Sequence, residues 1–367
     1  MTTMIFIIKP TLACNFRCKY CYLSAESKVT TYMDLEFAKR ILLEIKEQYN
    51  SHQKLEILWH GGEPLLWGIE NYRIIFEFID KEFTDVRHVI SMQTNLSLIT
   101  DEFIDLFLKY NVSVGISLDG PQNINDSERV FPNGRGTFNT VLSKLRHCKE
   151  RGLHMGCIIV ATKKHIGRIP ELYNFMCDNG INFKMNPLFI SGEAKRNESE
   201  LGLTIDEYVT MTTELFDLWF YDKKNKINNS KFIDIASGLL TRKMSLCSFG
   251  ENCQEHVICV APNGDVLPCG RFCDSELMHF SYGNLHNEHY CDVLKRIKES
   301  KAYKRADFIK NSNCSKCKYF NICHGGCLHD GYINSGDFES KTFMCSANKK
   351  IFSHIESRLK ETGLMQI

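Results

Sequence analysis

Three cysteines near the start of the chain have the type and spacing to do chemistry. Cys14, Cys18 and Cys21 stand at CxxxCxxC spacing, directly after an apolar, strand-like run at residues 4–8. A short loop with this spacing can wrap three thiolates around one corner of a cubane iron–sulfur cluster, and such clusters usually take four cysteines. One iron is then left open to a small molecule, which indicates a catalytic centre by the same logic as an open zinc site.

The motif resembles the signature of radical S-adenosylmethionine (SAM) enzymes. Those enzymes carry an aromatic residue before the third cysteine, and Tyr20 stands at that position here. The resemblance implies that Cys14, Cys18 and Cys21 hold a [4Fe–4S] cluster that binds SAM. The residues alone also allow a zinc knuckle or three unrelated thiols buried as small hydrophobic groups.

Strand-like and helix-like segments alternate through the first two-thirds of the chain. Strands are expected at 5–8, 55–59, 89–93, 112–118, 155–160 and 181–188, and helices at 34–49, 69–83, 101–109, 137–151, 169–178 and 205–219. Continuous apolar strands joined by helices predict an α/β fold with a parallel sheet. Six units fall short of an eight-unit barrel. The resemblance implies a partial, open (β/α)6 TIM-like barrel, whereas periodicity alone equally allows a doubly wound sheet.

Ligands of parallel α/β folds bind at the carboxyl ends of the strands, and Gly61, Gly62, Glu63 and Pro64 follow the second expected strand. Paired glycines let a backbone approach a ligand closely, and carbonyl groups and Glu63 can accept hydrogen bonds from an ammonium group. By resemblance, this stretch holds the amino group of the methionine moiety of SAM. Taken alone, the same residues are more often a plain strand-to-helix turn.

Further polar residues follow the third and fourth expected strands. By resemblance, Ser117 contacts the ribose of SAM and Arg129 its carboxylate, which an arginine can bind bidentately. Gln93 and Asn95, with Tyr20, complete the expected cofactor contacts. A helix-capping serine and a solvated arginine are equally ordinary interpretations of Ser117 and Arg129, and residues 119–121 (Asp-Gly-Pro) form an ordinary turn signal.

The last third of the chain carries a second set of cysteines that resembles the SPASM extension of radical SAM enzymes. Family precedent assigns Cys247, Cys253, Cys269 and Cys327 to one auxiliary cluster and Cys314, Cys317, Cys323 and Cys345 to another. With the SAM-binding cluster, this implies three [4Fe–4S] clusters. The alternative is a structural zinc site, because zinc would accept the spacing of Cys314, Cys317, Cys323 and Cys327.

Six other cysteines have no assigned ligand role: Cys148, Cys157, Cys177, Cys259, Cys273 and Cys291. The first three lie in expected helices or strands and are interpreted as buried packing residues. Cys273 follows Cys269 by four residues, so it is either a thiol that faces the substrate or a spectator.

The expected organisation is a barrel at 1–222, a bridge at 223–246, a cysteine-rich auxiliary-cluster domain at 247–345 and a C-terminal helix at 346–367. The chain has 367 residues, of which 43% are hydrophobic, and a net charge of +1. A net charge this small gives no electrostatic field that would favour binding to nucleic acid. No apolar run reaches the ~18 residues that span a bilayer. The 17 cysteines come without an export signal. They therefore indicate metal ligation in the reducing cytoplasm rather than disulfides.

The resemblance implies the reaction. A flavodoxin- or ferredoxin-type reductant supplies an electron, SAM yields a 5′-deoxyadenosyl radical, and that radical removes a hydrogen atom from an unactivated carbon. Auxiliary clusters without an open iron are suited to accept a second electron, so we expect a two-electron oxidation. SPASM enzymes of this size mostly modify peptides, and the expected partner is a ribosomally made precursor peptide. Because Cys14 lies so close to the start of the sequence, we expect the peptide to be read by the barrel and bridge or by a separate recognition protein.

The type of oxidation stays open among several interpretations. Anaerobic sulfatase-maturating enzymes, which form formylglycine from Cys or Ser, have a similar length and layout, but they carry an aspartate base directly after the cysteine matching Cys269. Here that residue is Gly270, which favours a side-chain crosslink, either a cyclophane carbon–carbon bond or a thioether. Oxidation of a small molecule is another alternative, and a zinc-binding interaction protein is the non-enzymatic one.

Overall fold

The barrel is built from six parallel strands in consecutive order. The computed structural model describes residues 2–49, 53–224 and 227–365. The strands are β1 (Thr2–Ile8), β2 (Gln53–Trp59), β3 (His88–Thr94), β4 (Ser113–Ser117), β5 (Met155–Ala161) and β6 (Asn182–Pro187), and they pair in the order β6-β5-β4-β3-β2-β1. A doubly wound sheet would reverse its strand order partway along. The consecutive order therefore confirms the partial barrel and excludes that alternative.

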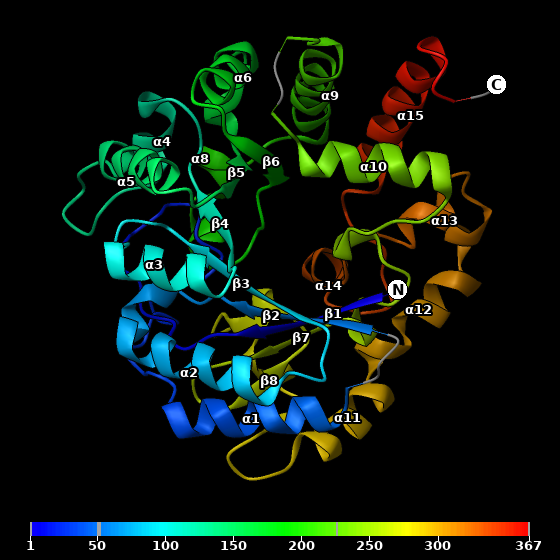
Figure 1. The fold of residues 1–367 in the computed structure, drawn as a ribbon. Coiled ribbons are helices and arrows are strands. Elements are labelled where there is room, and N and C mark those ends of the chain that lie inside the picture. Colours follow the sequence, from blue (N-terminus) through cyan, green and yellow to red (C-terminus); the bar gives the residue numbers. More distant parts are fainter. Residues whose placement is uncertain (1, 50–52, 225–226, 366–367) are drawn as a thin grey trace.

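Helices cover the outer side of the curved sheet (Figure 1). They are α1 (Leu35–Glu47), α2 (Ile69–Glu82), α3 (Asp101–Lys109), α5 (Phe138–Glu150), α6 (Ile169–Asp178) and α9 (Ile205–Tyr221). In α1, the Asp34 side chain caps the N-terminus by accepting from the Phe37 backbone N–H, and Ala38, Ile41 and Leu42 are fully buried. Burial of such faces against apolar strands is the main stabilising contribution to the fold.

The cysteine-rich region extends the same sheet, which the sequence patterns did not predict. Strand β7 (Val257–Val260) pairs in parallel with β1, and all four of its residues are buried. Strands β8 (Asp265–Leu267) and β9 (Gly283–Asn284) follow as antiparallel neighbours. The barrel and the cysteine-rich region therefore share one nine-stranded sheet.

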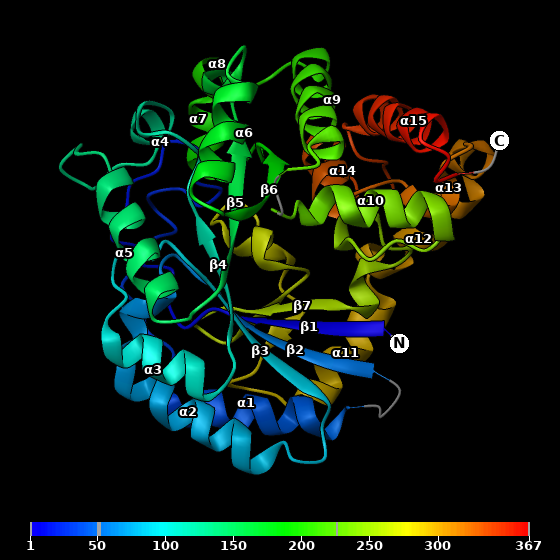
Figure 2. The ribbon, with the colours of Figure 1, turned by 45° about the horizontal axis from the view of Figure 1, so that its top comes forward.

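The expected bridge contains a helix. Helix α10 (Ser230–Thr241) begins after Asn229, whose side chain accepts from the Phe232 backbone N–H, and it packs with α9 and α15 (Cys345–Glu361), as Figure 2 shows. Residues 225–226 of the expected bridge and residues 366–367 of the expected C-terminal helix lie outside the described residues. Within the described parts of the chain, no helix is long and apolar enough to cross a membrane.

Candidate active site

The three N-terminal cysteines line a cavity of about 210 Å³ at the carboxyl ends of the barrel strands. Residues that follow or end all six strands contribute to its wall. Of the expected cofactor contacts, those that line it are Tyr20, Gly61, Gly62, Gln93, Asn95, Ser117 and Arg129. Residues that the sequence interpretation did not single out also line it, among them Tyr22, His60, Asn186 and Phe189. Glu63 and Pro64 do not.

Glu63 is fully buried and joins two loops that contribute to the cavity wall. Its carboxylate accepts hydrogen bonds from Leu65 N at 3.0 Å, Thr94 Oγ1 at 2.7 Å and Asn95 N at 2.7 Å. Burial raises the pKa of Glu63 to about 6 against these hydrogen bonds. Both carboxylate oxygens thus hold the β2 and β3 loops together rather than facing the cavity.

The two glycines are required by the backbone of the cysteine loop. A Cβ on Gly62 would lie 2.2 Å from the Ala13 carbonyl oxygen, and one on Gly61 would lie 2.3 Å from that of Thr11. The Gly62 N–H donates to Thr11 O at 3.1 Å. The glycines were predicted to let the backbone approach a ligand closely. In this structure they let the loop after β2 pack closely against the backbone of the cysteine loop.

Arg129 presents a buried positive charge at the cavity wall, with only 5% of its surface exposed. Its Nη1 donates to the Tyr20 hydroxyl at 2.7 Å, and that hydroxyl donates to Asp119. Burial by itself would lower the pKa of Arg129, but the neighbouring Cys18, Tyr20 and Asp119 outweigh it and raise the pKa. The buried Arg129 Nε has no hydrogen-bond partner among the described residues. A charged donor without an acceptor fits the carboxylate that the sequence interpretation placed here.

Asp119, which the sequence analysis treated as part of a turn, is fully buried. Besides Tyr20, it accepts from the Val160 backbone N–H at 3.0 Å. The neighbouring Glu128 is also fully buried. Burial, with the charge of Asp119, raises the pKa of Glu128 to about 8. The position of Asp119, two residues beyond the carboxyl end of β4, was the signal that could have identified it.

Pairs of polar side chains complete the wall. Gln93 Nε2 donates to Ser117 Oγ at 3.3 Å, so these two expected cofactor contacts are adjacent. Asn95 Nδ2 donates to Asn15 Oδ1 at 2.8 Å and lies 3.9 Å from Cys14 Sγ. Because burial lowers the pKa of His60 to about 3, with a further contribution from Lys9, His60 is a neutral donor or acceptor at neutral pH.

The cysteine thiols need a cationic partner to ionise. Burial raises the pKa of Cys14 to about 12, with further contributions from Glu63 and Cys18, and burial also raises the pKa of Cys18. Metal-ligating thiols must be deprotonated. Three soft thiols around one cavity, beside a charged arginine, therefore fit an iron–sulfur cluster that carries an anionic ligand.

The eight C-terminal cysteines gather in two places. Cys314, Cys317, Cys323 and Cys345 line a cavity of about 430 Å³. At the other place, low solvation raises the pKa of the half-buried Cys269 to about 12, with smaller contributions from Cys253 and Cys247. Cys269 in turn contributes to raising the pKa of Cys327. In the described part of the chain, no three His, Cys, Asp or Glu side chains could hold a single metal ion. Cys314, Cys317, Cys323 and Cys345 are spaced around their cavity rather than gathered on one point.

Among the other cysteines, Cys148 and Cys157 are buried and Cys177 is half-buried. Cys259 and Cys273 are fully buried with their sulfurs 3.6 Å apart. The fully buried Lys9 lies in the same region, and its Nζ donates to Tyr22 Oη at 2.9 Å and to Gly270 O at 2.7 Å. This lysine therefore links the cysteine loop of the barrel to the loop that follows Cys269.

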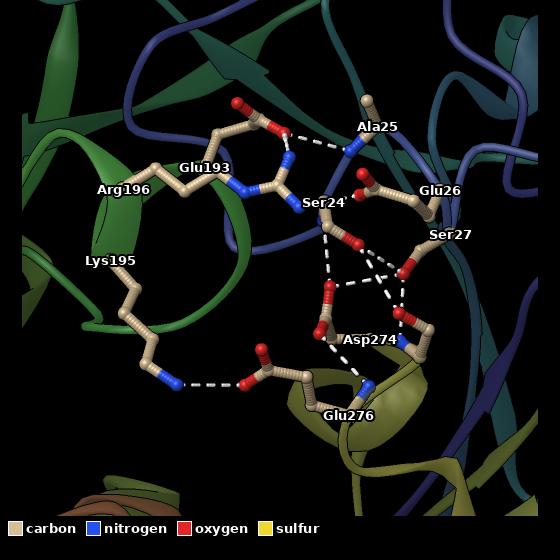
Figure 3. Close-up of polar contacts among 10 residues, drawn as sticks. Ser24, Ala25, Glu26, Ser27, Glu193, Lys195, Arg196, Asp274 and Glu276 are labelled. Atoms are coloured by element: carbon tan, nitrogen blue, oxygen red, sulfur yellow. Dashed lines mark hydrogen bonds and ion pairs between the residues drawn. The ribbon is translucent and has the colours of Figure 1, made fainter.

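A polar junction ties the cysteine loop to the C-terminal region (Figure 3). It joins three segments: residues 24–27, 193–196 and 274–276. At its centre the buried Asp274 accepts from Ser24 N at 2.6 Å and from Ser27 Oγ at 3.0 Å. Two exposed ion pairs surround it, Arg196 with Glu26 and Lys195 with Glu276.

Comparisons with known proteins agree with this architecture. The radical SAM superfamily model matches residues 8–176. A cysteine-type anaerobic sulfatase-maturating enzyme of Clostridium novyi is 25% identical over 370 residues, covering 98% of this chain and 97% of that protein. An uncharacterised protein of Methanothermobacter thermautotrophicus is 34% identical over 212 residues, covering 58% of this chain and 77% of that protein.

Two solved structures share the fold. The structure of anSMEcpe with bound AdoMet and the Cp18Cys peptide superposes with a TM-score of 0.84 at 22% identity, covering 98% of both chains. Streptococcus suis SuiB bound to the precursor peptide SuiA superposes with a TM-score of 0.66 at 18% identity, covering 94% of this chain and 76% of SuiB.

Proposed function

Because the chain belongs to the radical SAM superfamily, we propose that it is an oxidoreductase that oxidises a side chain of a ribosomally made peptide by two electrons. One observation carries the proposal: three thiols, a charged arginine with an unpartnered donor and a set of polar groups line one cavity at the strand ends. When bound to a reduced cluster, SAM supplies a 5′-deoxyadenosyl radical that abstracts hydrogen.

The chain's own residues then have distinct roles. Cys14, Cys18 and Cys21 hold the cluster and leave one iron for SAM. Arg129, oriented by Tyr20, binds the SAM carboxylate, and the carbonyl groups of the glycine pair receive its amino group. The adjacent Gln93 and Ser117 bind the nucleoside, and Asn95 stands beside Cys14. Glu63 supports the cavity wall through its hydrogen bonds to Thr94 and Asn95.

The two C-terminal sets of thiols are proposed to hold two further [4Fe–4S] clusters, which accept the second electron. Eight soft ligands in two groups of four, one of which lines a cavity, support this assignment. A flavodoxin- or ferredoxin-type protein is proposed as the reductant. The peptide is read by the barrel and bridge or is presented by a separate recognition protein. We propose a cytoplasmic location, since eleven of the 17 cysteines are proposed as cluster ligands and must stay reduced.

A peptide substrate is supported by the solved neighbours, whose structures contain the Cp18Cys peptide or the SuiA precursor. We propose a side-chain crosslink, cyclophane or thioether, as the product. Gly270 offers no carboxylate after Cys269, and its carbonyl is occupied by Lys9. Formylglycine formation is the second candidate, favoured by a likeness to the sulfatase-maturating enzyme that spans 98% of the chain.

Mass spectrometry separates the two. The anaerobically reconstituted enzyme is incubated with a peptide encoded beside its gene and, separately, with a sulfatase-type Cys peptide. A crosslink removes two hydrogens from the first peptide, without an aldehyde, and blocks fragmentation between the joined residues. An aldehyde on the second peptide would instead establish formylglycine chemistry, and no modification of either peptide would contradict the peptide assignment.

A further inference from the structure

Arg271 lies between the cavity of the barrel and one set of C-terminal thiols. Its guanidinium carbon is 3.3 Å from the centroid of the Phe189 ring, and Phe189 lines the barrel cavity. On the other side, Arg271 Nη1 is 3.3 Å from Cys327 Sγ and donates toward it. Arg271 is also two residues beyond Cys269, another member of the same thiol set.

The same guanidinium group is paired with one carboxylate. Arg271 Nη1 is 3.1 Å from Asp330 Oδ1, and the exposed fractions of the two side chains are 23% and 9%. The charge of Asp330 therefore partly cancels that of Arg271 at the thiols. Low exposure keeps both charges poorly screened by solvent, so their fields act on the neighbouring sulfurs more strongly than surface charges would.

We propose that Arg271 and Asp330 set, with opposite signs, the reduction potential of the auxiliary cluster held by Cys247, Cys253, Cys269 and Cys327. The inference rests on the proposed function, which places a cluster there. Hydrogen bonds to ligand sulfurs and net local charge are two of the levers on cluster potentials. A cation that donates to a ligand sulfur stabilises the more negative, reduced cluster and raises its potential, whereas the carboxylate lowers it.

Gly270 stands where the sulfatase-maturating enzymes carry an aspartate, and Arg271 directly follows it. A cation beside the cluster favours electron acceptance, which is the step that a two-electron oxidation requires of it. The stack on Phe189 fixes the guanidinium between the SAM cavity and the accepting thiols. Arg271 and Asp330 are thus positioning and tuning residues that act through the cluster.

The test is a redox titration followed by electron paramagnetic resonance. It uses full-length protein in which Cys14, Cys18 and Cys21 are replaced by Ala, so only the auxiliary clusters titrate. In this background, R271M should lower one of the two midpoint potentials and D330N should raise the same one. Each shift should reach at least a tenfold change in the oxidised-to-reduced ratio, about 59 mV for a one-electron couple. R271K keeps the charge but loses the planar fork, so its shift should be smaller than that of R271M.

The control is K195M, which removes a positive charge from an exposed ion pair of the junction and should move neither potential. Shifts of the same sign for R271M and D330N, or no shift for either, would overturn the proposal. If R271M loses iron, R271K takes its place in the test. The midpoint potential should then shift in opposite directions in R271K and D330N, and shifts of the same sign would overturn the proposal. Absence of any auxiliary signal before substitution would instead contradict the proposed clusters themselves, so the two failures are distinguishable.

Discussion

Arg129 illustrates how a buried charge can be maintained for a ligand. Burying an unpaired ion is costly, yet Arg129 is 5% exposed and keeps one donor without a partner among the described residues. The Tyr20 hydroxyl compensates part of that cost, because it accepts a hydrogen bond from Arg129 and donates one to Asp119. The remaining donor, Nε, is suited to an anionic ligand.

Replacing Arg129 by Gln should weaken SAM binding roughly 10- to 100-fold, because a hydrogen bond to a charged group contributes about 1.5–3 kcal/mol. Equilibrium binding of SAM to cluster-loaded protein measures the effect. The matched control is R135Q, an exposed arginine of the same loop, which should bind SAM as wild type does. Wild-type affinity in R129Q would contradict the assigned role.

Glu128 gives a pH-dependent prediction. Its pKa in the folded protein, about 8, is above the ordinary carboxyl value because of burial and the charge of Asp119. The native state therefore holds a proton that the unfolded state releases, so the contribution of Glu128 to stability is complete below pH ~4.5 and is lost as pH rises through about 8.

The neutral variant E128Q lacks this dependence. Between pH 6 and 8, wild type should lose roughly 1–2 kcal/mol of stability relative to E128Q. Thermal unfolding of both proteins across this range measures the difference. Parallel stability profiles for the two proteins would show that Glu128 does not titrate in this way.

At the scale of elements, the glycine pair after β2 positions the cysteine loop. G62A should destabilise the protein by roughly 1–3 kcal/mol, because overpacking against backbone atoms cannot relax easily. It should also reduce iron bound at the first cluster, as measured by iron content and thermal unfolding. In G156A, the added Cβ meets nothing within 4 Å, so this strand variant should behave as wild type. Equal iron content and equal thermal stability of the two variants would argue that Gly62 does not position the cysteine loop.

Local patterns predicted the six barrel strands, because apolar runs lie in consecutive residues. The family resemblance pointed to most of the expected cofactor contacts that line the cavity, whereas Tyr22, His60, Asn186 and Phe189 were not singled out. The hydrogen bonds of Glu63 could not be predicted, because its partners, Thr94 and Asn95, come from another loop. Pairing of Val257–Val260 with β1 depends on residues about 250 positions apart, which no local pattern encodes. Asp119 was overlooked because its turn signal gives no sign of burial.

At the scale of the whole molecule, a shared sheet and the junction around Asp274 hold the cysteine-rich region against the barrel (Figure 3). D274A should leave SAM cleavage largely intact but lower product per 5′-deoxyadenosine by roughly tenfold or more, since misplacement of about 1 Å can cost about 10²-fold. Chromatographic quantification of both products gives this ratio.

The control for the junction is K195A, which breaks only the exposed pair with Glu276. Such pairs contribute about 0–1 kcal/mol, so its product ratio should match wild type. An unchanged ratio in D274A would show that the junction does not position the auxiliary region for the reaction.

The most direct test of the account is 5′-deoxyadenosine release by the variant in which Cys14, Cys18 and Cys21 are all replaced by Ala. The account predicts no release under reducing, anaerobic conditions, while the iron of the C-terminal thiol sites remains bound. Release at the wild-type rate would contradict the assignment of these three thiols to the SAM-binding cluster.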